Sequence, residues 1–223
     1  MRSKSITALV ALVAVLALSA VASASASAYT PTFVPLEGGF PATFSGSVGQ
    51  AKWSGPVEAT SCEGGASITG EITGSKTASL TIELHQCVDE KGEACRSEGA
   101  EGGQEVLSGT ATLVIADREP ARAALLFTPK QEMVICEAPL WQELKGSLVI
   151  PVETSAGGKD LTFKVKGNGA GKQEHTVYVN ENNEEIKGVY FKINFGTTYK
   201  QAALELEGLV EAPLSEPLEI NGE

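Results

Sequence analysis

Four cysteines are the residues whose type and number point most directly to chemistry in this chain. They are Cys62, Cys87, Cys95 and Cys136. An even number of cysteines in an exported chain is typical of disulfides, and four cysteines allow three connectivities. A zinc site needs ligands at closer spacing, such as two cysteines separated by two residues. The nearest cysteines here are eight positions apart, with only His85 as a neighbouring imidazole, so we expect two disulfides and no metal.

The other reactive side chains form no recognisable catalytic motif. The chain has two histidines, His85 and His175, and it lacks the G-x-S-x-G, H-E-x-x-H, P-loop and dinucleotide-binding signatures. Glycoside hydrolysis requires two opposed carboxylates. The spacing of the 25 glutamates singles out no such pair, and most of them fall on polar strand rows or in loops. We therefore expect a solvated acidic face, and we assign no catalytic residue and no cofactor.

Two further features offer groups that could bind a ligand. Residues 180–185 (NENNEE) carry oxygens that suit calcium, but the EF-hand spacing and its glycine are absent, and a hairpin tip of this composition needs no ion. Four aromatic side chains are candidates for a surface that binds sugar: Trp53, Trp141, Tyr178 and Tyr190. Cross-strand aromatic pairs also stabilise sheets without a ligand. Because aromatic residues make up only 6% of the chain, we favour the structural role.

The elements that must position these groups are strands, because apolar and polar residues alternate with period 2 after residue 40. Residues 66–84 give the clearest hairpin, with turn-forming residues at 73–76. Folding the chain about Ser75 places Ile68 opposite Ile82, so that apolar residues meet apolar ones and polar residues meet polar ones. A half-buried antiparallel pair requires this match.

The same hairpin, extended outward, brings Cys62 beside Cys87. The two cysteines lie on opposite rows in this register, and one β-bulge, which we place at residues 64–65 (Gly-Gly), corrects the mismatch. Neighbouring strands provide the Cα separation that a disulfide needs. We therefore predict Cys62–Cys87, which leaves Cys95–Cys136.

A second hairpin is expected near the C-terminus. Folding about Glu184 pairs Val177 with Phe191 and places Tyr178 opposite Tyr190 on the other face. The acidic tip, residues 181–185, then lies in solvent. The predicted core residues of this hairpin are Val177, Val179, Val189, Phe191 and Ile193.

The remaining pattern completes an all-β chain. A polar, glycine-rich segment at 89–103 is interpreted as a solvated loop held by Cys95. Further strands are expected over 104–116, 121–127, 132–137, 141–152, 161–166, 204–209 and 218–220. The total is about twelve strands, with no long helix after residue 28. This predicts an antiparallel β-sandwich or a curled barrel.

The N-terminus has the three parts of a secretory signal peptide. Arg2 and Lys4 are followed by an apolar run at 6–18 and by small residues at 26–28, which places cleavage before Tyr29. The run is short for a bilayer span, and no second apolar stretch approaches that length. We therefore expect residues 1–28 to be a signal peptide, and 29–223 to be a single exported domain with no membrane span.

Charge excludes one class of partner. The full chain carries a net charge of −11, and removal of Arg2 and Lys4 with the leader takes it to −13. A protein that binds nucleic acid needs a basic face to neutralise phosphates. This acidic chain is therefore not expected to bind nucleic acid.

Several short motifs resemble those of a family of uncharacterised secreted proteins of actinobacteria. They are the Ser-Cys pair at 61–62, the run GEITGSKT at 70–77, the strand that closes on Cys87, the following Cys95, and the segments KGSLVI at 145–150 and LEI at 218–220. The resemblance covers most of the mature chain, and its motifs are turns and disulfide positions. It implies an exported β-rich protein and agrees with the disulfide pairing above. It implies no activity.

The sequence thus favours a non-catalytic binding or structural protein outside the cytoplasm, acting on the cell wall or another extracellular polymer. Two alternatives stay open. One is a secreted acid–base hydrolase that uses paired glutamates, and the other is a carbohydrate-binding module.

Overall fold

The structure is a computed structural model that describes residues 29–222, except 56–59, 119, 131, 137–141, 168–170 and 196–197. The described part of the chain contains 20 strands and no helix, which confirms the all-β class. The strands outnumber the predicted twelve because several contain only two to four residues, too few for an alternating pattern to be visible. The expected signal peptide and Trp141 lie outside the described residues.

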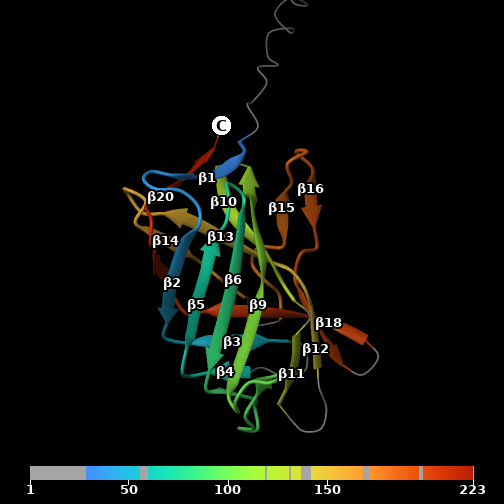
Figure 1. Ribbon diagram of the computed structural model, residues 1–223. Coiled ribbons are helices and arrows are strands. Elements are labelled where there is room, and N and C mark those ends of the chain that lie inside the picture. The colour runs from blue at the N-terminus through green and yellow to red at the C-terminus, as the bar shows by residue number, and fades with distance from the viewer. Residues whose placement is uncertain are drawn as a thin grey trace, which may run out of the picture.

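A sheet of ten antiparallel strands curls into a nearly closed barrel (Figure 1). Two of them, β15 (Val177–Val179) and β16 (Glu185–Lys187), branch off at β9, and the other eight follow one another around the barrel. In sheet order they are β19 (Val210–Pro213), β14 (Asp160–Phe163), β13 (Leu148–Thr154), β10 (Ala121–Pro129), β9 (Gln104–Arg118), β6 (Thr77–His85), β5 (Ala66–Ile72) and β2 (Ala42–Val48). The end of β19 meets β2, since Phe44 bridges to Leu214 and the Ser215 N–H donates to the Thr43 carbonyl at 2.8 Å. Of the two predicted architectures, the structure therefore has the curled barrel.

A second sheet of eight short strands packs against the barrel, and in Figure 1 its strand β3 runs across the direction of β5, β6 and β9. In sheet order it contains β7 (Cys87–Val88), β4 (Thr60–Cys62), β3 (Ala51–Ser54), β18 (Thr198–Leu206), β17 (Phe191–Phe195), β12 (Gln142–Gly146), β11 (Glu132–Ile135) and β8 (Arg96–Ser97). A separate pair joins the two ends of the described chain, β1 (Pro31–Pro35) and β20 (Leu218–Gly222).

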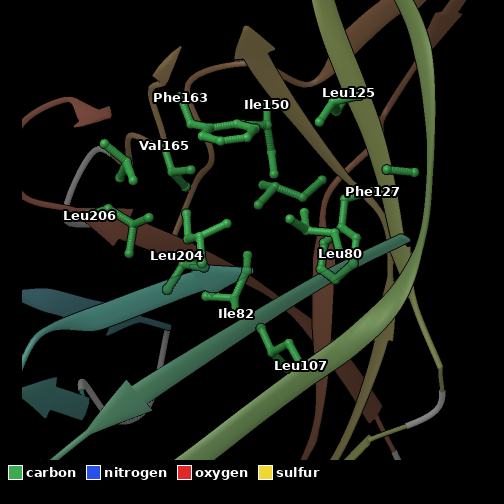
Figure 2. Close-up of a cluster of buried hydrophobic side chains, with 14 of the residues drawn as sticks. Leu80, Ile82, Leu107, Leu125, Phe127, Ile150, Phe163, Val165, Leu204 and Leu206 are labelled. Carbon is green, nitrogen blue, oxygen red and sulfur yellow. The ribbon is translucent and has the colours of Figure 1, made fainter. Parts of the chain in front are cut away.

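The two larger sheets share one hydrophobic core. Figure 2 shows Leu80, Ile82 and Leu107 of the barrel directed toward Leu204 and Leu206 of β18. Alternate residues of a strand face the same side of the sheet. The alternating sequence therefore gives each strand one apolar row, which points into the core. In β6, for example, Ala78, Leu80, Ile82 and Leu84 are all buried while the residues between them are partly or fully exposed.

The predicted hairpin at 66–84 is confirmed with its register, because Ile68 lies opposite Ile82 in β5 and β6. Both predicted disulfides are present, Cys62–Cys87 and Cys95–Cys136. Cys62 lies directly opposite Cys87, one residue out of step with the β5–β6 register.

The irregularity that shifts this register includes the predicted Gly64–Gly65 site. Gly65 and, across from it, Gln86 both have a positive φ, of 79° and 55°. The Gly64 N–H donates to the carbonyl of His85, and the His85 N–H donates to the carbonyl of Gly65. At this point the two strands leave the barrel and continue as β4 and β7 of the second sheet.

The C-terminal hairpin prediction is wrong in its register. The hairpin consists of β15 (Val177–Val179) and β16 (Glu185–Lys187), in which Tyr178 lies opposite Ile186 and not Tyr190. The reason lies in the turn, where the Asn180 side-chain oxygen accepts hydrogen bonds from the N–H groups of Asn182 and Glu184. The fold point is therefore residue 182, with residues 181–185 exposed as predicted.

The other predicted half of that hairpin belongs to another sheet. Phe191 is fully buried in β17, between β12 and β18. Val179 is buried as predicted, whereas Val177, Val189 and Ile193 are only partly buried. The hairpin instead covers the outside of the barrel, where Tyr178 and Val189 pack against the buried cluster Val114, Ala116, Ala124 and Val149.

Residues 89–103 form, as predicted, a mostly exposed loop held by Cys95, and it contains one short strand. The Asp89 carboxylate accepts hydrogen bonds from the N–H groups of Lys91 and Glu93, which closes a tight turn. The chain then adds β8 to the edge of the second sheet, and Cys95 is fully buried. Side-chain hydrogen bonds and the disulfide thus order a segment rich in glycine and glutamate.

Candidate functional site

A buried glutamate lies where the barrel meets the second sheet. Glu105 is the second residue of β9, opposite Leu84 of β6, and its side chain is directed inward on the same row as Leu107. The residue is 1% exposed. A buried carboxylate is costly unless it is paired or protonated, so this position needs a specific explanation.

Glu105 borders a small cavity whose other polar groups come from the second sheet. Trp53 and Ser54 of β3 and Thr60 of β4 lie in its wall, together with Gln142 and Gln201. The cavity measures about 30 Å³, which is enough for one or two water molecules. It is therefore much smaller than a pocket for a drug-sized ligand, which needs about 300 Å³ or more.

The polar groups at this cavity are not paired with one another. Among the described residues, the Trp53 Nε1, the Ser54 Oγ and both carboxylate oxygens of Glu105 have no hydrogen-bond partner. Burial raises the pKa of Glu105 from 4.5 to about 7, and the nearby Trp53 indole N–H opposes part of that rise without completing a hydrogen bond of normal geometry. Glu105 can therefore gain or lose a proton near neutral pH.

The Cys95–Cys136 disulfide is the immediate neighbour of Glu105. A carboxylate oxygen of Glu105 and the two sulfurs lie within 4.8 Å of one another. The Thr60 hydroxyl lies 3.9 Å from the Cys95 sulfur. This trio has ligand types that suit a metal, but both sulfurs are joined in the disulfide and no thiolate is available to bind one.

A second candidate site is an open groove on the surface beside Tyr190. It measures about 590 Å³, and its lining includes Tyr190, Glu174, Thr176 and Gln201. The groove floor is fixed by Gln173, whose amide group makes three hydrogen bonds to backbone groups of Lys166 and Leu204. The ammonium group of Lys192 lies over the Tyr190 ring, 5.3 Å from its centre.

Three of the four aromatic residues predicted as surface binders are described by the structure, and these three do not form one surface. Trp53 is 4% exposed and packs on Phe191 with ring centres 5.6 Å apart, so its assignment to the surface is wrong. Trp53 shares the buried row of β3 with Ala51, and Lys52 between them is exposed. Tyr178 packs on the outer face of the barrel, and Tyr190 lines the groove. Trp141 lies outside the described residues.

His85 and the 180–185 tip, which were also weighed in the sequence, have hydrogen-bonding roles within the fold. The His85 Nε2 lies 3.3 Å from the Ser67 hydroxyl on the neighbouring strand. The Asn180 side-chain oxygen is used by the turn, and its amide nitrogen donates to the Glu184 carboxylate at 3.0 Å. These bonds give the side chains of Asn180 and Glu184 a role in the turn.

Comparison with known proteins adds no family. No family model matches the chain, and no match was found among curated proteins or solved structures. In the part of the chain that the structure describes, no helix has the length and apolar character needed to cross a bilayer.

Proposed function

We propose that the mature protein is an exported, non-catalytic binding protein that contacts a polysaccharide of the cell wall or the extracellular space through the groove at Tyr190. The tripartite leader supports export. The disulfides agree with it, because disulfide bonds persist in oxidising compartments outside the cytoplasm.

The observation that carries the proposal is the position of Tyr190 in the wall of an open groove. Sugars present apolar C–H faces and a rim of hydroxyl groups, so an aromatic ring beside hydrogen-bonding side chains suits them. The ammonium group of Lys192 lies over one face of the Tyr190 ring, and in this proposal a ligand stacks on the other face. Glu174, Thr176 and Gln201 supply donors and acceptors around it.

A paired-glutamate hydrolase has less support. Glycosidases place two carboxylates about 5–9.5 Å apart across the reacting bond. Among the described lining residues, the groove has only Glu174 and the buried cavity has only Glu105 as a carboxylate. Neither of these two places provides both an acid and a nucleophile or base. A third pocket, of about 260 Å³, is lined by both Glu153 and Glu174, together with the cations Arg122 and Lys164.

The test is co-sedimentation of the mature protein with insoluble polysaccharides, namely peptidoglycan, cellulose and chitin. Tyr190→Ala should weaken binding about tenfold, which corresponds to about 1.4 kcal/mol and to the upper range of one aromatic contact. Tyr199→Ala is the matched control, because Tyr199 is 40% exposed, lies under the ammonium group of Lys145, and is not part of the groove. Failure of the wild type to bind any of the three polymers, or equal binding by both variants, would refute the proposal.

A further inference from the structure

We propose that Cys95–Cys136 is a redox-active disulfide that exchanges with external dithiols, and that Glu105 is the proton donor to the Cys95 sulfur. This inference does not depend on polysaccharide binding, because Glu105 and the two cysteines are not among the residues that line the groove at Tyr190. The substrate class is a dithiol reductant, either a small molecule or the exposed thiols of a second protein.

The two sulfurs are not equivalent, and this difference sets the direction of attack. Cys95 is fully buried, whereas Cys136 is partly exposed and lies in the cavity wall just after β11. We infer that an incoming thiolate attacks the Cys136 sulfur, so that the Cys95 sulfur is the leaving group. Thiol–disulfide exchange is faster when the departing sulfur is stabilised.

Two groups are placed to stabilise the Cys95 sulfur as it departs. A carboxyl oxygen of Glu105 lies within 4.8 Å of it, and the Thr60 hydroxyl lies 3.9 Å from it. In the disulfide form the Glu105 carboxyl group has no hydrogen-bond partner among the described residues. The thiol that forms at Cys95 can supply that missing partner.

Two successive exchange steps reduce the Cys95–Cys136 disulfide. The reductant thiolate forms a bond to the Cys136 sulfur, the Cys95–Cys136 bond breaks, and its electron pair goes to Cys95. The proton of the Glu105 carboxyl group moves to the Cys95 sulfur, which leaves a carboxylate and a mixed disulfide at Cys136. The second thiol of the reductant, as its thiolate, then attacks the mixed disulfide and releases Cys136. Cys136 leaves as a thiolate, and solvent returns one proton to it and one to the Glu105 carboxylate. The reductant becomes a disulfide and the protein becomes a dithiol, a transfer of two electrons.

Glu105 must be protonated to serve as the donor, and its surroundings favour that state. The other described residues at the cavity come from β3, β4, β11, β12, β17 and β18, and none of them carries a charge. With no nearby cation to stabilise the carboxylate, burial raises its pKa to about 7. The donor is therefore present below pH 7 and is lost as the pH rises above 7, when the buried negative charge also repels a new thiolate.

The test is the rate at which dithiothreitol reduces each disulfide of the folded wild-type protein between pH 5.5 and 8.5. Samples are quenched with an alkylating agent, and peptide mass spectrometry reports the two disulfides separately. Rates are divided by the concentration of reductant thiolate. Cys62–Cys87 is the internal control, because both its cysteines are fully buried and no carboxylate or imidazole of the described residues completes a similar trio there.

The expected result has two parts. Cys95–Cys136 is reduced first, and its rate per thiolate falls at least about tenfold as the pH rises through 7, while that of Cys62–Cys87 does not fall. Glutamine is nearly the same size as glutamate but has no acidic proton. Glu105→Gln should therefore remove the fall in rate with pH and lower the rate at pH 6 by a similar factor. General acids typically contribute about 10²–10⁴-fold. Equal reduction of the two disulfides, or an unchanged pH profile in Glu105→Gln, would overturn the proposal. The first comparison uses only wild-type protein, so it does not depend on how the variant folds.

Discussion

The buried Glu105 should make the folded protein less stable as the pH rises from about 4.5 to about 7. In the unfolded chain this carboxyl group has its ordinary pKa of 4.5, and in the folded protein burial raises the pKa to about 7. Between these values the folded state keeps a proton that the unfolded state has lost, so the free energy of unfolding falls with pH. The slope is about 1.4 kcal/mol per pH unit, and the total loss is about 3 kcal/mol. Above pH 7 this contribution is constant.

Glu105→Gln isolates that contribution, because the amide has a similar shape and does not titrate. The wild type and Glu105→Gln, both with their disulfides formed, are unfolded with denaturant at pH 4.5, 6 and 8. The difference between their free energies of unfolding is taken at each pH. The contributions of the other titrating groups cancel in this difference. Relative to the wild type, the variant should gain about 3 kcal/mol between pH 4.5 and pH 8. Glu101→Gln is the matched control on the exposed turn before β9, and it should stay within about 0.5 kcal/mol of the wild type at every pH.

Two results would refute this reasoning. A difference between the wild type and Glu105→Gln that does not change with pH would mean that solvent reaches the carboxyl group. A wild type that gains stability over the variant as the pH rises would mean that a cation or several hydrogen-bond donors hold the carboxylate in the folded state.

Two substitutions test the fold, and N-terminal sequencing tests the expected leader. Phe191→Ala should lower the free energy of unfolding by about 3–5 kcal/mol in denaturant melts, because it opens a cavity beside Trp53. Gly65→Ala should lower it by at least about 1 kcal/mol, because φ is 79° and the new Cβ would overlap the Val48 carbonyl oxygen; an unchanged melt would contradict the positive φ. N-terminal sequencing of the exported protein should return Tyr29, and Met1 would contradict the cleavage prediction.

The alternation of apolar and polar residues predicted the correct register for the hairpin at 66–84 but not for the C-terminal hairpin. A slip by one residue would exchange the buried and exposed rows of a strand, so alternation excludes it. A slip by an even number of residues leaves each row on its own face of the sheet. Only the turn then decides which of these registers the hairpin adopts. Residues 73–76 identify their turn, whereas the run at 180–185 offers several equivalent fold points. The hydrogen bonds of Asn180 select one of them, and they depend on a side-chain conformation that composition does not reveal.

The buried glutamate could have been found in the sequence by following a single row. From residue 105 to residue 113 the odd positions are Glu, Leu, Gly, Ala and Leu, and the even positions from 104 to 112 are Gln, Val, Ser, Thr and Thr. The odd row is therefore the apolar one, and Glu105 is its only charged member. Val106 obscures this pattern because it is the one apolar residue on the polar row. What the row could not show is the partner surface, since Trp53 and Thr60 come from a different sheet.

The same one-residue shift that corrects the register of the first disulfide also brings the components of the buried site together. Without it, the two strands of the 66–84 hairpin would run on in the barrel sheet as a regular ladder. The bend at Gly64–Gly65 instead directs β4 and β7 into the second sheet. There the Cys95 N–H donates to the Cys87 carbonyl at 2.8 Å, which sets the Cys95 sulfur beside Thr60. Glu105 remains on β9 of the barrel. It lies beside these residues because the bend directs β4 and β7 across the end of β9.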